Sequence, residues 1–159
     1  MNTKTKLREI AQEIELAAEP AMVFSILHTP SAICLWWTAS QAIVIAHRGG
    51  LWVATWGPNN DRPDYITAAT IDVFEPPYRL VLNRFRYHSS SEPLPFQADF
   101  TVEFTLKPVK GGTLLRVLQS GFPMDAAADN YFAACRQGWR NTFENIKRFV
   151  APRASPHPA

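Results

Sequence analysis

Alternating apolar and polar residues run through most of this chain. The segment from Asp99 to Lys107 is the clearest case, since every second residue from Phe100 to Leu106 is apolar. A period of two is typical of a strand that buries one face. The same pattern predicts strands over 8–17, 41–46, 51–56, 65–74, 79–87 and 113–120. Short turns, such as Lys-Gly-Gly at 110–112, join neighbouring strands and predict antiparallel pairing.

Two short helices are predicted after the first strand. Pro20 opens one of them, because a proline at the first helical position loses no needed hydrogen bond. The residue before Pro30 avoids the helical region, so this helix should end there. Ser31 can cap the second helix, which carries Trp36 and Trp37.

A long amphipathic helix is predicted near the C-terminus. Its apolar residues recur at spacings of three or four and form one stripe: Phe132, Cys135, Trp139, Phe143, Ile146 and Val150. Pro152 should end this helix, and the proline-rich residues 151–159 are expected to form a disordered tail. One long helix on an antiparallel sheet is an α+β fold, here a single domain over residues 1–150.

Composition narrows the class of protein. The 159 residues, 47% of them hydrophobic, predict one globular domain and exclude disorder throughout. No run of 18 apolar residues occurs and the N-terminus does not resemble a signal peptide, so we expect a cytoplasmic protein without a membrane insertion. The net charge of +2 is too small to indicate a nucleic-acid partner.

No metal or cofactor site is predicted. Cys34 and Cys135 stand a hundred residues apart and read as reduced thiols, although a disulfide between them is left open. The four histidines have no helical metal spacing, and nucleotide-binding motifs are absent from the sequence. Candidate acids and bases are scattered, so the sequence assigns no catalytic residue and leaves enzymatic activity uncertain.

Several short motifs follow one another in an order that resembles a known superfamily. They are Glu19-Pro20, Val23-Phe24, Trp36-Trp37, Gly49-Gly50-Leu51-Trp52, Glu75-Pro76-Pro77-Tyr78-Arg79-Leu80, Gly111-Gly112-Thr113, Ser120-Gly121-Phe122 and Gly138-Trp139. Over residues 8–150 the chain resembles the START-like, or SRPBCC, superfamily. Within it, the chain is most similar to homologues of the activator of the ninety-kilodalton heat-shock protein ATPase. The resemblance implies a helix-grip fold, with a curved antiparallel sheet of about six to seven strands around the long helix and an apolar cavity between them.

Two polar residues stand at positions predicted to face that helix. Gln119 is in phase with Leu115 and Val117, and Arg84 is in phase with Leu80 and Leu82. A buried polar group needs a partner, so both could contact the polar end of a ligand in a mostly apolar pocket. The alternative is that they lie near strand ends, where they reach water or bond the backbone.

The predicted ligand-contacting residues are those expected to face the space between the sheet and the long helix. They are Trp36, Trp52, Trp56, Leu82, Arg84, Phe104, Gln119, Trp139 and Phe143. Plain core packing is the alternative for Trp36, Trp52 and Trp56, whereas Trp139 and Phe143 are expected to face inward in either case. The function predicted first is binding of an apolar or lipid-like small molecule. A chaperone-ATPase regulator that contacts a protein partner, and a cavity enzyme such as a polyketide cyclase or dehydratase, are the alternatives, and a homodimer is left open.

Overall fold

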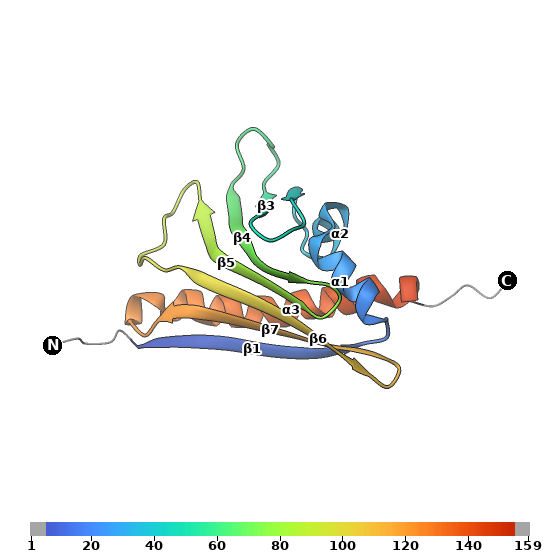
Figure 1. Ribbon diagram of the computed structural model, residues 1–159. Coiled ribbons are helices and arrows are strands. Elements are labelled where there is room, and N and C mark those ends of the chain that lie inside the picture. Colours follow the sequence, from blue (N-terminus) through green and yellow to red (C-terminus); the bar gives the residue numbers. More distant parts are fainter. Residues whose placement is uncertain (1–5, 155–159) are drawn as a thin grey trace.

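The computed structural model describes residues 6–154 and contains one curved antiparallel sheet with a long helix along one face (Figure 1). The sheet has seven strands in the order β1-β7-β6-β5-β4-β3-β2. Their bounds are β1 Leu7–Leu16, β2 Gln41–Val44, β3 Leu51–Trp56, β4 Tyr65–Glu75, β5 Arg79–Ser89, β6 Phe100–Val109 and β7 Gly112–Pro123. All neighbouring strands pair antiparallel, which confirms the α+β helix-grip prediction.

Strands β2 to β7 follow one another in the sheet as they do in the chain. The last strand, β7, pairs with the first, β1, which forms the far edge. The β6–β7 turn has Gly111 at φ +84°, a conformation that glycine adopts without steric cost. In β6, every second residue from Phe100 to Leu106 is buried, as the alternation predicts. The inward face of β7 likewise carries Leu115, Val117 and Gln119.

The two short helices lie at one end of the sheet (Figure 1). They are α1 Pro20–His28 and α2 Pro30–Trp36. The prediction of Ser31 as the cap of α2 was wrong, because the helix begins at Pro30 and Ser31 lies within its first turn. Thr29 holds the N-cap position, but its hydroxyl donates to the Ser25 carbonyl at 2.7 Å and does not cap α2.

A short 3₁₀ turn, η1 Ala126–Ala128, leads into α3 Asp129–Ala154, which spans the length of the sheet. The helix passes Pro152, where it was predicted to end. A proline this close to the helix end costs one backbone hydrogen bond, the one that its missing N–H would have donated to the Arg148 carbonyl. Residues 155–159 of the predicted tail lie outside the described residues. None of the helices in residues 6–154 has both the length and the apolar run that crossing a membrane requires.

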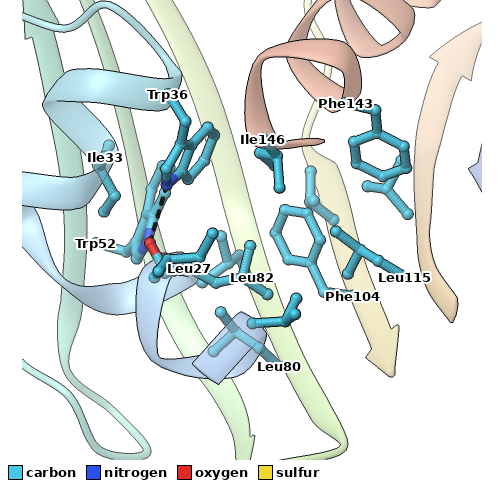
Figure 2. Packing of buried hydrophobic residues seen from close by; sticks show 14 of the residues in the cluster. Leu27, Ile33, Trp36, Trp52, Leu80, Leu82, Phe104, Leu115, Phe143 and Ile146 are labelled. Atoms are coloured by element: carbon cyan, nitrogen blue, oxygen red, sulfur yellow. Dashed lines mark hydrogen bonds between the residues drawn. The ribbon is translucent and has the colours of Figure 1, made fainter. Parts of the chain in front are cut away.

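The core fills the space between the sheet, α1, α2 and the second half of α3. Figure 2 shows Phe143 and Ile146 of α3 above Phe104 and Leu115 of the strands. These four side chains are 3% exposed or less, so this half of the interior is solid.

One irregularity in β5 determines which side chains of this strand point into the other half of the interior, beneath the first half of α3. The pairing of β5 with β6 shifts between Leu82 and Phe85, and Arg84 has φ +48°. An extra residue in one strand is a β-bulge, and it reverses which of the following side chains point inward. Phe85 is therefore buried and Arg84 is exposed.

Candidate functional site

A pocket of about 390 Å³ lies between the first half of α3 and the inner face of the sheet. Residues of α3, β3, β4, β5 and β7, together with Trp37 after α2, form its walls. The lining comprises Trp37, Trp56, Tyr65, Thr67, Phe85, Tyr87, Gln119, Tyr131, Ala134, Cys135, Gly138, Trp139 and Thr142. Most of this surface is apolar, as is usual for small-molecule sites.

The two halves of α3 meet the sheet differently. In the second half, Phe143, Ile146 and Val150 are fully buried against the core. In the first half, Phe132 and Cys135 of the same stripe are only half-buried. The helix therefore closes the interior at one end and leaves the pocket beneath its other end.

Aromatic rings make up the pocket walls. Trp37 packs edge-on against Trp56 with ring centroids 4.9 Å apart, and lies nearly parallel to Trp139 at 6.4 Å. Tyr87 stacks on Tyr65 at 5.8 Å and contacts Tyr131 at 5.9 Å. Such ring pairs hold one another in place and present flat, apolar faces.

One buried hydrogen bond crosses from the helix to the sheet beside the pocket. The Trp139 indole N–H donates to Gln119 Oε1 at 2.7 Å, and the Gln119 side chain is almost fully buried. Because an indole nitrogen can only donate, the Gln119 oxygen must be the acceptor, and its amide nitrogen lies on the other side of the group. The prediction that Gln119 points inward is confirmed.

Burial favours the neutral form of three titratable groups in the lining, because it raises the pKa of each. Burial raises the pKa of the Cys135 thiol to about 11, and the hydrogen bond with Tyr131 offsets this only in part. Burial likewise raises the pKa of the Tyr87 and Tyr131 phenols above their usual range. The pocket thus presents phenol and thiol groups in their uncharged forms.

Three of the predicted ligand-contacting residues meet at this pocket, namely Trp56, Gln119 and Trp139. The others in the interior belong to the core cluster: Trp36, Trp52, Leu82, Phe104 and Phe143. Trp36 and Trp52 donate their indole N–H groups to the backbone carbonyls of Ile26 and Leu27, at 2.9 and 3.0 Å. These two bonds tie α1 to the core, and Figure 2 shows Trp36 and Trp52 next to Leu27.

The inward orientation predicted for Arg84 was wrong. Strict alternation from Leu80 and Leu82 would bury it, but the bulge turns its side chain to solvent and places Phe85 in the pocket instead. A guanidinium in this aromatic enclosure would have no carboxylate partner, since the lining contains none.

The sequence reasoning missed most of the lining. On α3 the missed residues Tyr131, Gly138 and Thr142, with Cys135, recur at spacings of three or four and form a second stripe beside the predicted one. This spacing was a usable signal, although Gly138 and Thr142 are not apolar. Trp37, Tyr65, Thr67, Phe85, Tyr87 and Ala134 complete the missed set.

No metal centre is found in the described part of the chain, where no three His, Cys, Asp or Glu side chains gather closely enough. Cys34 and Cys135 are both free and half-buried. The arrangement can therefore enclose a flat apolar molecule, and its polar groups can form hydrogen bonds with that molecule.

A curved antiparallel sheet around a long C-terminal helix, with a pocket between them, defines the helix-grip class of START-like, or SRPBCC, proteins. The family model described as "Activator of Hsp90 ATPase homolog 1-like protein" matches residues 17–151. The chain belongs to that family. A comparison with curated proteins gives no match.

Solved structures share this fold at low sequence identity. Protein MLL2253 from Mesorhizobium loti superposes with a TM-score of 0.76 at 20% identity, over 94% of this chain and 100% of that one. The Aha1 dimer from Colwellia psychrerythraea gives 0.64 at 16%, over 88% and 93% of the two chains. DynU16, from the dynemicin biosynthetic locus, gives 0.69 at 17%, over 89% of this chain and 46% of that one.

Proposed function

We propose that this protein binds an apolar small molecule in the pocket beneath the first half of α3. The observation that carries the proposal is an aromatic-lined pocket of about 390 Å³ between α3 and the inner face of the sheet, directly beside the packed core. Ligand pockets of roughly 300–1,000 Å³ are usual for small molecules. Protein interiors pack densely, so a space of this size beside a filled core suits an occupant.

Gly138 supports the proposal, because it lines the pocket and borders open space. A Cβ atom added to Gly138 would meet no atom within 4 Å, although the residue lies in the middle of α3 and lines the pocket. A mid-helix glycine costs about 1 kcal/mol relative to alanine. The helix therefore carries a glycine at a position where the surrounding atoms leave room for a side chain.

The chemistry of the lining favours binding over general acid–base catalysis. The lining includes no carboxylate, imidazole or amine, and the pKa of Cys135 is raised rather than lowered. General acids and bases work best with a pKa near the working pH, and nucleophilic thiols need a lowered one. Binding a ligand without reaction requires neither a pKa near the working pH nor a lowered thiol pKa.

Equilibrium dialysis with fluorene, a flat uncharged hydrocarbon, tests the proposal in three proteins. The natural sequence should bind one fluorene per chain. Gly138→Leu projects a side chain into the pocket and should weaken binding at least tenfold, with the fold retained by circular dichroism. Ala133→Leu adds the same side chain to an exposed position of α3 and should bind as the natural protein does. Equal binding by all three proteins, or by none, would refute the proposal.

A further inference from the structure

Three of the four buried polar side chains of the described chain lie at this one pocket. The four are Thr67, Thr113, Gln119 and Thr142, each 6% exposed or less. Thr67, Gln119 and Thr142 line the pocket, whereas Thr113 lies elsewhere. Polar groups are seldom buried without a partner, so their concentration at a mostly apolar surface calls for a reason.

The hydrogen bonding separates Thr113 from the other three. Its hydroxyl donates to the Ala18 carbonyl at 2.7 Å, a bond internal to the fold. Among the described residues, the Thr67 and Thr142 hydroxyls have no hydrogen-bond partner, and Gln119 uses only its oxygen, which accepts from Trp139. The Gln119 amide nitrogen, a pure donor, is therefore free to bond a molecule in the pocket.

These three groups are not sealed inside the protein. The wholly enclosed side-chain polar atoms without a partner, among residues 6–154, are Thr55 Oγ1 and Asn83 Oδ1. The polar atoms of Thr67, Gln119 and Thr142 therefore keep contact with open space, and the space that all three residues line is the pocket. They come from β4, β7 and α3, so hydrogen-bond donors stand on three different walls.

The same lining excludes charged ligands. None of its residues carries a formal charge at neutral pH. An ionised group moved from water into such a site loses its hydration without gaining a partner, which is costly. An uncharged acceptor, such as a carbonyl oxygen, loses less and gains hydrogen bonds from the waiting donors.

We infer that Thr67, Gln119 and Thr142 form a polar subsite that selects uncharged aromatic molecules carrying hydrogen-bond acceptor oxygens, such as aromatic ketones. Stacked rings such as Tyr65 and Tyr87 hold the flat faces, and the three donors bond oxygens at the ligand edge. This inference rests on the proposed function and names the chemical class of its ligand.

Three probes of one shape test it by equilibrium dialysis. Fluorene has no acceptor, fluorenone adds one carbonyl oxygen, and a carboxylate of fluorenone adds a charge. A plain apolar pocket would bind fluorene best, because a carbonyl must leave its water. The subsite predicts that fluorenone binds about tenfold more tightly than fluorene, the effect of one or two hydrogen bonds. It also predicts that the carboxylate binds at least tenfold more weakly than fluorenone.

Shape-conserving variants assign the preference to particular residues. Thr67→Val with Thr142→Val removes two donors and should lower the preference for fluorenone at least fivefold while fluorene binding holds. Thr113→Val removes a buried hydroxyl outside the pocket and should leave the preference unchanged, even if the protein becomes less stable.

The possible results separate the inference from the proposed function. Tighter binding of fluorene than fluorenone, an unchanged preference in the double variant, or strong binding of the carboxylate would overturn the polar subsite and leave an apolar binding protein. Binding of no probe would overturn both.

Discussion

Arg84 occupies a left-handed backbone conformation, with φ +48°, within strand β5. For a residue with a Cβ atom this conformation costs roughly 1–2 kcal/mol, which glycine avoids. Arg84→Gly should therefore raise the free energy of unfolding by about 0.5–1 kcal/mol, after the larger entropy that glycine loses on folding. Urea unfolding measures this change.

Arg86 provides the matched control for that prediction. It is exposed two residues further along β5 and is not among the residues with positive φ. Arg86→Gly should lower the free energy of unfolding, because glycine weakens a regular strand and the ion pair with Asp99 is lost. If both glycine variants lose the same stability, the strain assigned to Arg84 is absent.

Cys135 should be slow to react although it lines an open pocket. Burial raises its pKa to about 11, so about one thiol in a thousand is ionised at pH 8. In a Cys34→Ser variant, alkylation of Cys135 by iodoacetamide should accelerate about tenfold for each pH unit between 8 and 10. A rate that is already level by pH 8 would mean that the thiol is not held neutral.

Helix α3 should be stable at one end and looser at the other. Ile146 and Val150 lie in the packed core, whereas Tyr131 and Cys135 are only half-buried and line the pocket. Local opening is easiest where few apolar contacts hold an element, so backbone amides over 131–142 should exchange with solvent faster than those over 143–150. Hydrogen exchange followed by NMR measures both segments in one sample, and equal protection along the helix would contradict this account.

Regular elements could be predicted from sequence because their signals are periodic and local. The alternation over 99–107 gave the correct inward face of β6, and the spacing of the C-terminal stripe gave α3. The predicted inward orientation of Arg84 was wrong because a bulge adds one residue to β5 and so shifts the alternation of its side chains. No turn residue marks this bulge in the sequence. The prediction that α3 ends at Pro152 was also wrong, because near the end of a helix one missing N–H donor is tolerated.

The pocket was harder to predict than the elements that form it. Trp36 and Trp52 satisfy the same aromatic pattern as Trp37 and Trp56, yet the first two pack in the core and the other two line the pocket. What separates the two pairs is the curvature of the sheet against a straight helix. The curvature sets the distance between the sheet and α3 at each point along the helix. It depends on all seven strands together, and a local sequence pattern does not encode it.

Taken as a whole, the interior of the molecule has two parts, the packed core and the pocket in which we propose that a ligand binds. The end formed by α1, α2 and the second half of α3 is filled, and the opposite end holds the aromatic pocket. A rigid core next to an open site allows a ligand to be held without rebuilding the fold. The fold alone does not specify a ligand, since proteins that share a fold have many functions.

Intermolecular nuclear Overhauser effects between bound fluorenone and the protein test this division most directly. We predict contacts from the ligand protons to the methyl groups of Thr67 and Thr142 and to the α-protons of Gly138. Contacts confined to the exposed apolar residues Ile43 and Leu51, which lie outside the pocket lining, would contradict the account.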